Sequence, residues 1–329
     1  MIKEFLKEIS GISFIDIGSS GYLDAKWKNL ESFIDLIGFD PNVEECERMS
    51  KLPNNFHSLK YLPFALSGDS SSQTLYKTKS IYCYSLLEPN TEWLQRFSFG
   101  DLFERIGEEK VNTVKLNDVQ MLKDNDTDII KIDTQGLELP ILSNAEIILD
   151  KSFLVETETG FVDNYKGETT YAQIDSFMRS KGFLLFDINT NHRVPRNNHF
   201  KEVNTGKEQI LWCEATWMKD YVALVKKDAI NPDDINREKA LKILIICAQQ
   251  GCVDYGYELA LLFSELKLID DTELKNLETR ENWLIVEDSN EEDKSNVINL
   301  MLRLLPSRLR REISKQAQKA ASQKHLFHS

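Results

Sequence analysis

Residues that would stabilise a secreted or membrane-spanning fold are scarce in this chain. Only five of the 329 residues are cysteines, and none of them forms a C-x-x-C pair. A scattered, odd set predicts free thiols in a reducing compartment instead of a disulfide framework. No apolar run approaches the roughly 18 residues that suggest a transmembrane helix. Acids also interrupt the N-terminal segment where a signal peptide would have its apolar core. We therefore expect a cytoplasmic protein.

Positive charge is also in short supply. The chain has 40 Lys and Arg against 53 Asp and Glu, a formal net charge of -13, which excludes non-specific nucleic-acid binding through the bulk surface. Residues 303–329 are the exception, with seven basic residues and one acid. Residues 301–313 mix leucines with arginines, a pattern typical of a basic amphipathic helix on an anionic membrane surface. We expect this tail to contact the inner face of the membrane peripherally, to pack on the acidic body of the protein, or to form a frayed end.

Short apolar runs alternate with helix-like segments along the first two thirds of the chain. Strands are predicted for the apolar runs at residues 13–17, 32–39, 56–66, 128–132 and 153–157. Later segments predict an amphipathic helix at residues 171–180 and the last strands at residues 183–188 and 221–225. This alternation favours an α/β fold with a mostly parallel sheet.

The pattern changes near residue 228. Apolar residues at helical spacing predict helices at residues 236–250, 255–266 and 272–285. We therefore divide the chain into a domain of residues 1–228, an all-α extension of residues 229–302 and the basic tail of residues 303–329.

Two predicted strands end in residues that can carry chemistry. Residues 129–139 (I-I-K-I-D-T-Q-G-L-E-L) form an apolar run that ends on Asp133 and a polar glycine turn. Residues 14–21 (F-I-D-I-G-S-S-G) make the same transition near the N-terminus, and Asp40 ends the next strand. Ligands of open α/β sheets bind at the carboxyl ends of the strands, where an acid accepts hydrogen bonds from ribose hydroxyls. The sequence therefore predicts a nucleoside-binding edge on which Asp133 acts.

The glycine turn favours one nucleoside cofactor over another. A dinucleotide pyrophosphate is met by G-x-G-x-x-G, whereas this turn has only Gly18 and Gly21. S-adenosylmethionine has no phosphate, and its amino-acid end and its sulfonium suit backbone groups and carboxylates. The acids Asp16, Asp40 and Asp133 therefore fit S-adenosylmethionine better.

Six motifs, in family order, resemble the FkbM family of S-adenosylmethionine-dependent methyltransferases. They are F-I-D-I-G-S-S-G (14–21), G-F-D-P-N (38–42), A-L-S-G (65–68), S-L-L-E-P-N (85–90), K-I-D-T-Q-G-L-E-L (131–139) and L-V-E-T-E (154–158). The resemblance covers roughly residues 12–225. It implies a class I methyltransferase fold, a Rossmann-like seven-stranded sheet whose last strand is antiparallel.

The resemblance also implies roles for individual residues. The glycine turn would surround the methionine part of the cofactor, and Asp40 would hold the ribose hydroxyls. Residues 65–67 would lie near the adenine, whereas Asp133 and Gln135 would border the methyl group and the acceptor. The full set of expected cofactor-binding residues is Asp16, Gly18, Ser19, Gly21, Asp40, Pro41, Ala65, Leu66, Ser67, Asp133 and Gln135.

Methyl transfer to a hydroxyl group requires a base that removes its proton. Asp133 is our first candidate, because its position at a strand end is nearest to the expected methyl group. Glu156 and Glu158 are rivals, since residues two apart in a strand share a face. His192 is a further candidate, in a polar segment that could overhang the acceptor. Three acids could also bind Mg²⁺, but we do not favour a metal here.

Together these features predict an S-adenosylmethionine-dependent O-methyltransferase. We expect its acceptor to be a hydroxyl of a sugar or glycan precursor, in polysaccharide or lipid-linked glycan biosynthesis. Two other classes remain open. A nicotinamide-dependent oxidoreductase would use the same edge for another nucleoside, and a non-catalytic scaffold would bind a partner through the helical extension.

Overall fold

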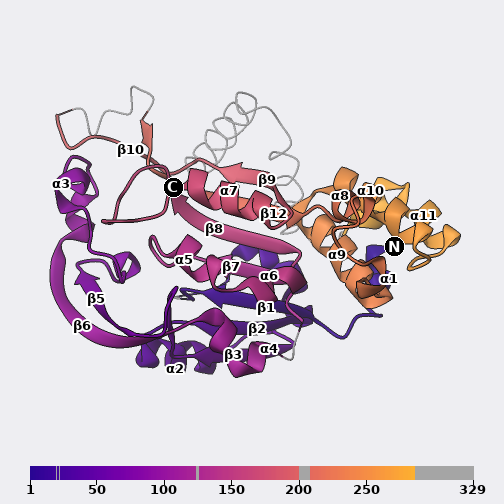
Figure 1. Ribbon diagram of the computed structural model, residues 1–329, viewed down its shortest axis with the longest axis horizontal. Coiled ribbons are helices and arrows are strands. Elements are labelled where there is room, and N and C mark those ends of the chain that lie inside the picture. Colours follow the sequence, from indigo (N-terminus) through magenta and orange to yellow (C-terminus); the bar gives the residue numbers. More distant parts are fainter. Residues whose placement is uncertain (20, 22, 124–125, 200–207, 286–329) are drawn as a thin grey trace, which may run out of the picture. The chain divides into compact units, whose positions relative to one another are not determined.

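A seven-stranded sheet in the order β3-β2-β1-β7-β8-β12-β9 forms the centre of the structure (Figure 1). The computed structural model describes residues 1–285 except residues 20, 22, 124–125 and 200–207. Neighbouring strands are parallel, except that β12 is antiparallel to both β8 and β9. The predicted class I methyltransferase fold, with its antiparallel last strand, is confirmed. The strands are Ile12–Ile17 (β1), Ile34–Phe39 (β2), Ser58–Leu62 (β3), Ile129–Ile132 (β7), Leu154–Gly160 (β8), Phe183–Asn189 (β9) and Trp212–Lys219 (β12).

The prediction of the last strand is wrong, because residues 221–225 form a helix. Helix α8 (Tyr221–Lys226) begins after Asp220, whose side chain accepts a hydrogen bond from the Ala223 N–H at 3.0 Å. A short apolar run fits a buried strand and a helix equally well. The last strand is instead β12, in which Glu214 and Thr216 interrupt the apolar pattern.

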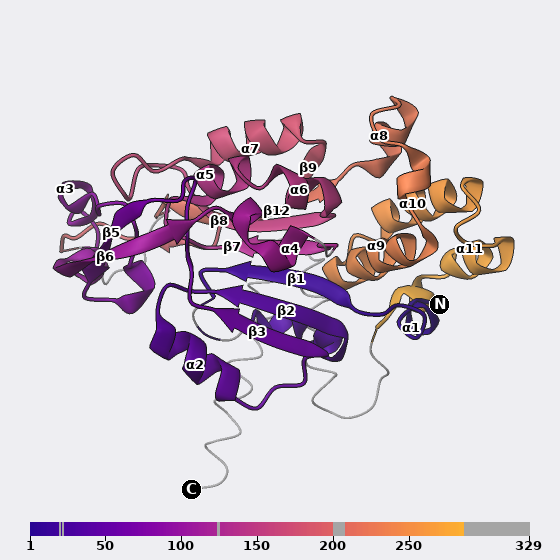
Figure 2. The ribbon, with the colours of Figure 1, turned by 60° about the horizontal axis from the view of Figure 1, so that its bottom comes forward.

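A smaller sheet, in the order β4-β6-β5, is inserted in the chain between β3 and β7. The sequence pattern does not predict β5 or β6, because most residues of both strands are exposed or half-buried and four of the ten residues of β6 are charged. Figures 1 and 2 both show β5, β6 and α3 beyond the carboxyl ends of the central parallel strands. The small strands are Ala65–Leu66 (β4), Ser72–Thr78 (β5), Arg105–Val114 (β6), Arg193–Val194 (β10) and Gln209–Ile210 (β11).

Helices cover both faces of the central sheet. Buried residues of β1, β7, β8 and β12 pack on one face with residues of α4, α5, α6 and α7 in a single cluster. On the opposite face Phe14 packs edge-on against Trp27 of a 3-10 helix (η1), with ring centroids 5.2 Å apart. The remaining helices are α1 (Ile2–Phe5), α2 (Val43–Lys51), α3 (Thr91–Leu94), α4 (Gln120–Lys123), α5 (Glu138–Ser143), α6 (Glu146–Lys151), α7 (Tyr171–Ser180), α9 (Arg237–Gln250), α10 (Val253–Glu265), α11 (Asp271–Leu277) and the 3-10 segments Ala25–Phe33 (η1), Ile81–Cys83, Gly100–Phe103, Leu116–Asp118, Pro232–Asp234 and Arg280–Trp283.

Local sequence signals place the ends of the main helices. The Asn42 side chain accepts hydrogen bonds from the Glu44 and Glu45 N–H groups at 3.0 and 3.2 Å and so caps the start of α2. Asn236 caps α9 by accepting from the Lys239 N–H at 2.8 Å. The same helix ends at Gly251, whose φ of 74° is a left-handed conformation that glycine adopts without strain.

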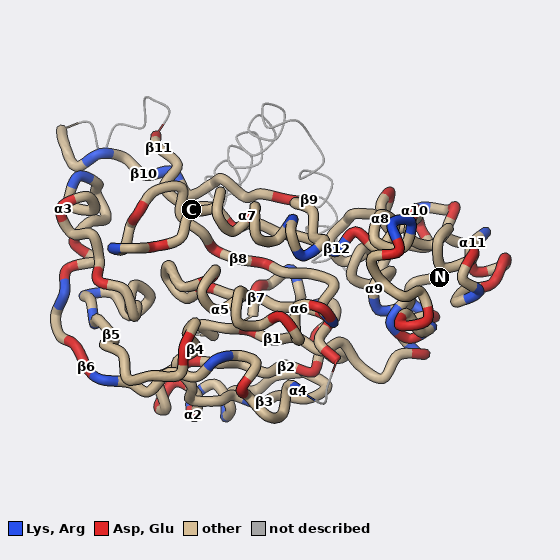
Figure 3. Tube along the Cα trace, viewed as in Figure 1, with Lys and Arg blue, Asp and Glu red and all other residues tan. Residues whose placement is uncertain are grey.

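The helices predicted after residue 229 are present and pack against the sheet domain. Residues 1–283 form one compact unit, in which α9 contacts α1, α10 and η1. Arg237 joins the extension to the N-terminal segment through Glu8 at 2.8 Å. The division at residue 228 stays a prediction, and residues 286–302 and the basic tail at 303–329 lie outside the described residues. Acidic and basic residues are interspersed on α8 to α11 (Figure 3).

Within the described residues, no helix combines the length and the apolar character needed to cross a bilayer.

Replacement of Ile245 by alanine tests how closely the extension is tied to the sheet. Ile245 in α9 is fully buried, so Ile245→Ala lowers the free energy of unfolding by about 2–5 kcal/mol. Leu261→Ala in α10, at a side chain that is 43% exposed, serves as the control, with a smaller loss. Denaturant unfolding followed by tryptophan fluorescence and circular dichroism should give one transition. Two transitions, with only the minor one shifted, would show that the extension folds separately.

Candidate functional site

Three acids end neighbouring strands at one edge of the central sheet. Asp16 is the next-to-last residue of β1, Asp40 follows β2 and Asp133 follows β7, and these strands are parallel neighbours. Burial raises the pKa values of the Asp40 and Asp133 carboxyl groups, and the charge of Asp16 raises both further. The structure therefore brings the acids of the predicted nucleoside edge within electrostatic reach of one another.

The glycine turn after β1 is held tightly against β2 and β7. Gly18 has a φ of 77°, and a Cβ atom there would lie 1.9 Å from the Asp133 carbonyl oxygen, so that no other residue fits. The N–H groups of Gly18 and Ser19 both donate to the Phe39 carbonyl at 2.9 Å. Gly21, with a φ of 94°, also adopts the left-handed conformation. The turn therefore presents backbone at the point where β1, β2 and β7 meet.

A row of alternating charges crosses the sheet next to this turn. Asp16, Lys131 and Glu156 are register partners on β1, β7 and β8, which places their side chains on one face. Lys131 Nζ lies 3.1 Å from Asp16 Oδ1, and Lys26 Nζ lies 2.6 Å from Glu156 Oε1. Burial opposes the charge of Lys131, but Asp16, Asp133 and Glu156 outweigh that effect and raise the pKa of its ammonium.

Both ends of this row receive further hydrogen bonds. The Ser19 hydroxyl donates to Asp16 at 2.7 Å. At the other end, the side-chain amide of Gln250, the last residue of α9, donates to Glu156 Oε1 at 3.2 Å. Glu156, one of the predicted rival bases, is therefore buried and bonded to both Lys26 and Gln250, and the helical extension supplies one of these partners.

Asp40 retains a hydrogen-bond acceptor that faces no partner. Its Oδ1 accepts from the Asn42 N–H at 2.7 Å, while Oδ2 accepts no hydrogen bond from a described residue. Burial raises the pKa of this carboxyl to about 6. Pro41, the residue between Asp40 and Asn42, is half-buried. The group can thus accept hydrogen bonds from a ligand hydroxyl.

Residues 65–67 form a buried wall close to the carboxyl end of β2. Ala65 and Leu66 are 6% and 5% exposed and Ser67 is 3% exposed. Leu66 belongs to the same buried cluster as Ile17 and Phe39, the last residues of β1 and β2. The predicted adenine neighbours therefore lie beside the ends of the strands that carry Asp16 and Asp40.

Gln135 links Asp133 to the neighbouring strand. It is one of three described non-glycine residues with positive φ, at 57°. Its amide donates to Asp133 Oδ1 at 2.7 Å and to Glu158 Oε1 at 3.5 Å, and its Oε1 accepts from the Tyr165 hydroxyl at 3.0 Å. The Ser85 hydroxyl donates to the Gln135 carbonyl at 2.8 Å. These contacts orient the amide between two carboxyl groups.

The pKa values of these two carboxyl groups are displaced upward. Burial raises the pKa of Asp133, whereas Lys131 and the Gln135 amide act against this rise. Burial raises the pKa of Glu158 well above its ordinary value, and the charges of Asp133 and Glu138 add to the rise. The pair therefore binds a proton more readily than two exposed acids would, as a general base requires near neutral pH.

Glu138 holds the turn that carries Gln135. It is 1% exposed, and its carboxyl oxygens accept from the Thr134 N–H at 2.9 Å and the Gly136 N–H at 3.1 Å. Burial raises its pKa to about 7, and the same backbone bonds limit that rise. Glu138 thus stabilises the backbone on which Asp133 and Gln135 depend.

His192 lies on the far side of Glu158 from Asp133. Glu158 pairs with Glu214 across β8 and β12, and His192 Nε2 lies 3.5 Å from Glu214 Oε1. The nearby His192 ring and a hydrogen bond from the Asn189 amide lower the pKa of Glu214 to about 2. The His192 ring also stacks on Trp212, with centroids 5.4 Å apart. The predicted candidates Asp133, Glu158 and His192 therefore follow one another along the same edge.

No group of three or more His, Cys, Asp or Glu residues that could hold a metal ion is found among the described residues.

Several residues of this site escape the sequence patterns. Lys131 and Glu138 lie within the K-I-D-T-Q-G-L-E-L motif, where a lysine in a buried strand and an acid at a helix start are visible signals. Glu214 lies in the unpredicted strand β12, and Gln250 is in the extension, where nothing in the sequence relates it to Glu156. Long-range pairing of this kind follows only from the three-dimensional structure.

Residues 24–185 match the sequence model of one family, described as the methyltransferase FkbM domain. No curated protein matches the chain. The match includes five of the six motifs, all but the glycine turn at residues 14–21. The chain therefore carries an FkbM-family methyltransferase domain and is an S-adenosylmethionine-dependent methyltransferase. This decides against the oxidoreductase and scaffold alternatives.

Solved structures of other methyltransferases are similar to this chain at low sequence identity. A TehB-like SAM-dependent methyltransferase from Corynebacterium glutamicum is 10% identical, with a TM-score of 0.31 over 67% of this chain and 87% of that one. A SAM-dependent methyltransferase from Methanosarcina mazei is 11% identical, with a TM-score of 0.30 over 64% of this chain and 92% of that one. A precorrin-6y C5,15-methyltransferase from Geobacter metallireducens is 11% identical, with a TM-score of 0.32 over 66% of this chain and 85% of that one.

The buried Glu138 carboxyl makes stability depend on pH. Its pKa of about 7 in the folded chain exceeds the ordinary 4.5, so the folded chain binds more protons than the unfolded chain between these values. The free energy of unfolding therefore falls as the pH rises through this window, by at most about 1.4 kcal/mol per pH unit for one group. Urea titrations of Glu138→Gln at a series of pH values should show a shallower fall. The exposed Glu265→Gln is the control, and an unchanged slope in Glu138→Gln would contradict this account.

Proposed function

We propose that this chain is an O-methyltransferase that acts on a hydroxyl group of a sugar or glycan precursor. The observation that supports this most directly is the pair Asp133 and Glu158, joined by the Gln135 amide at the carboxyl edge of the sheet. A half-buried carboxylate with an upward-shifted pKa suits removal of a hydroxyl proton as the new bond forms.

The residues of the edge fit S-adenosylmethionine. Asp40 Oδ2 has an open acceptor position for a ribose hydroxyl, and the glycine turn presents backbone that a side chain would block. The apolar wall of residues 65–67 suits the adenine. When bound, this cofactor supplies a methyl group on a positively charged sulfur. Asp16 and Ser19 would face its methionine part.

Asp133 is the proposed base. Lys131 acts against the rise in its pKa, so that the carboxyl is ionised over more of the neutral range than burial alone would allow. The hydroxyl proton of the acceptor would pass to this carboxylate, with Gln135 orienting it. Glu158 has the more strongly raised pKa and would hold a proton, which lets it donate a hydrogen bond to the acceptor. Glu156, paired with Lys26, would balance the charge of the row instead.

The surroundings of Glu158 support a hydroxylated acceptor. Carboxyl groups of Glu158 and Glu214 can hydrogen-bond several hydroxyls, and the stacked rings of His192 and Trp212 offer a flat surface of the kind on which sugar rings pack. Tyr165 lies on the other side of Gln135, and its hydroxyl donates a hydrogen bond to the Gln135 side chain. The choice of a sugar rests on this mixture of carboxylates and aromatic rings.

Replacement of Asp133 by asparagine separates binding from turnover. Asp133→Asn should retain affinity for S-adenosylhomocysteine but lose about 10²–10⁴-fold in kcat, because the base is removed while the shape is kept. Release of S-adenosylhomocysteine in the presence of a panel of nucleotide sugars and oligosaccharides measures turnover. Exposed Asp233→Asn is the control. Normal turnover in Asp133→Asn would move the base to Glu156, Glu158 or His192, and no turnover of the wild type on any panel member would remove the sugar assignment.

Asp40 gives the cofactor affinity a pH dependence. Its pKa of about 6 means that the carboxyl gains a proton as the pH falls below that value, and the neutral group accepts ribose hydrogen bonds less well. Calorimetry should therefore show weaker S-adenosylhomocysteine binding at pH 5 than at pH 8. Asp40→Asn should bind about 10- to 100-fold more weakly at pH 8, from the loss of charged hydrogen bonds. If the variant binds as tightly as the wild type, Asp40 does not hold the ribose.

A further inference from the structure

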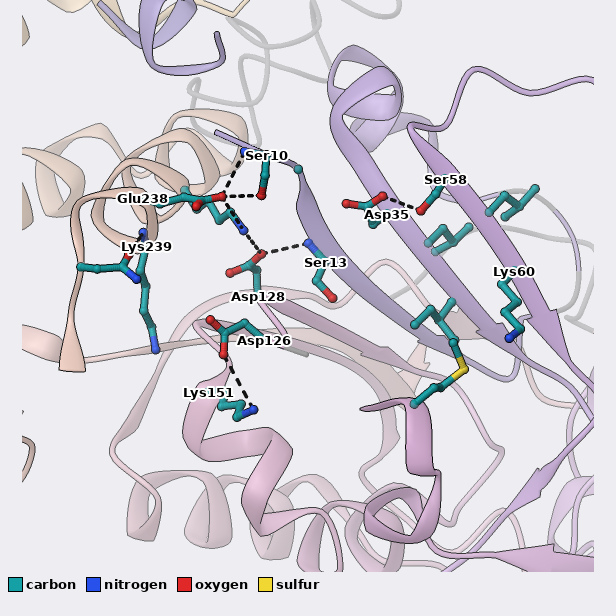
Figure 4. A pocket seen from close by; sticks show the side chains of 17 residues that line it. Ser10, Ser13, Asp35, Ser58, Lys60, Asp126, Asp128, Lys151, Glu238 and Lys239 are labelled. Atoms are coloured by element: carbon teal, nitrogen blue, oxygen red, sulfur yellow. Dashed lines mark hydrogen bonds and ion pairs between the residues drawn. The ribbon is translucent and has the colours of Figure 1, made fainter. Parts of the chain in front are cut away.

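A cavity of about 590 Å³ lies at the opposite edge of the central sheet from Asp16, Asp40 and Asp133. Residues at the amino ends of β1, β2 and β3, residues just before β7 and the first two turns of α9 line it (Figure 4). Small-molecule sites typically enclose about 300–1,000 Å³. The proposed methyl-transfer site uses none of these residues, so the cavity is a separate site in the same chain.

Two carboxylates of the cavity, Asp128 and Glu238, already have hydrogen-bond partners within the protein. Asp128 accepts from the Ser13 N–H at 2.9 Å and lies 3.5 Å from Lys242 Nζ. Glu238 accepts from the N–H and the hydroxyl of Ser10 at 3.0 and 2.5 Å. Figure 4 shows these bonds between α9 and the start of β1. These acids therefore need no cation from outside the chain.

Lys239, in the first turn of α9, is one of the lysines that line the cavity. Its ammonium makes no ion pair with a described residue, and it lies 5.9 Å from the centroid of the Tyr221 ring. Burial lowers the pKa of Lys239, the more distant Asp126 and Asp128 offset this only in part, and the charge of Lys151 adds repulsion. Lys151, itself 3.8 Å from Asp126, lines the same cavity. An anion between the two lysines would relieve both the desolvation and the repulsion.

The opposite side of the cavity suits an organic body. Ile37 of β2, which is half-buried, and Met121 of α4 belong to one apolar cluster and line this side, and Ser58 of β3 lies beside them at an exposed position, with its hydroxyl donating to Asp35. An inorganic ion would leave this apolar surface uncovered. We propose that the cavity is a second small-molecule site, which binds a small organic anion with its phosphate or carboxylate group at Lys239 and Lys151 and its body against β2 and β3.

Calorimetric titration of the full-length chain tests this site. The protein is first saturated with S-adenosylhomocysteine, so that the cofactor edge does not compete, and then titrated with ribose 5-phosphate, citrate or inorganic phosphate. We expect one organic probe to bind with one-to-one stoichiometry and to reveal whether phosphate or carboxylate is preferred. Inorganic phosphate should bind at least about tenfold more weakly, because it has no body to cover the apolar wall.

Variants of Lys239 connect the binding to this residue. Lys239→Met should raise the Kd of the organic probe about tenfold or more, as the loss of a charged hydrogen bond predicts. Lys239→Arg, which retains the charge, should bind within about threefold of the wild type. Lys275→Met removes the same charge from an exposed position of α11 and should leave the Kd unchanged.

Ser58→Trp provides a second readout in case Lys239→Met does not fold. The larger side chain, on an exposed residue of β3, should block the body of the ligand while every lysine remains. The proposal is overturned if neither organic probe binds at concentrations up to about 1 mM, or if Lys239→Met or Ser58→Trp binds as tightly as the wild type. Equal affinity for inorganic phosphate and the organic probes would mean an adventitious ion only, and would overturn it too.

Discussion

The close approach of the Gly18 turn to the backbone of Asp133 is the contact on which the rest of the candidate site depends. A Cβ atom at residue 18 would lie 1.9 Å from the Asp133 carbonyl oxygen, and the Asp133 N–H donates to the Ile17 carbonyl at 2.9 Å. β1 and β7 therefore end at a separation that only glycine permits. Because one contact positions both the glycine turn and the proposed base, neither can shift without the other.

The charged row of Asp16, Lys131 and Glu156 beside this contact is explained better by function than by stability. Buried ion pairs contribute little net stability, because the desolvation of both charges offsets their attraction, and apolar replacements often serve equally well. Lys131 nevertheless faces Asp16, Asp133 and Glu156. The Lys131 ammonium acts against the burial-driven rise in the pKa of Asp133, so that this carboxyl is ionised more fully than burial alone would allow. A fold that needed only packing at this edge would gain nothing from such a row.

The sequence predicts most of the central sheet and the acids at its edge, because buried parallel strands are continuous apolar runs that end in polar turns. It fails where this signal is absent. β6 has four exposed charged residues among its ten, β12 has Glu214 within it, and the apolar run at Tyr221 is too short to separate strand from helix. The sequence also does not predict which residues pair with the site residues, for another reason. Gln250 meets Glu156 across 94 residues of chain, and no local pattern encodes such a pairing.

Helix α9 touches both edges of the sheet domain. Its first turns line the cavity at the amino ends of the strands, whereas its last residues, Gln249 and Gln250, donate to the Lys26 carbonyl and to Glu156. The helix has 14 residues, a nearly rigid rod of about 21 Å. The residues that match the family end at 185, so the extension adds to the charged row a donor that the matched domain does not contain. A displacement of α9 at the cavity would move this donor relative to Glu156, because a helix transmits translation along its axis without bending. The extension therefore contributes residues to the cavity wall at one end of α9 and a hydrogen-bond donor to the charged row at the other.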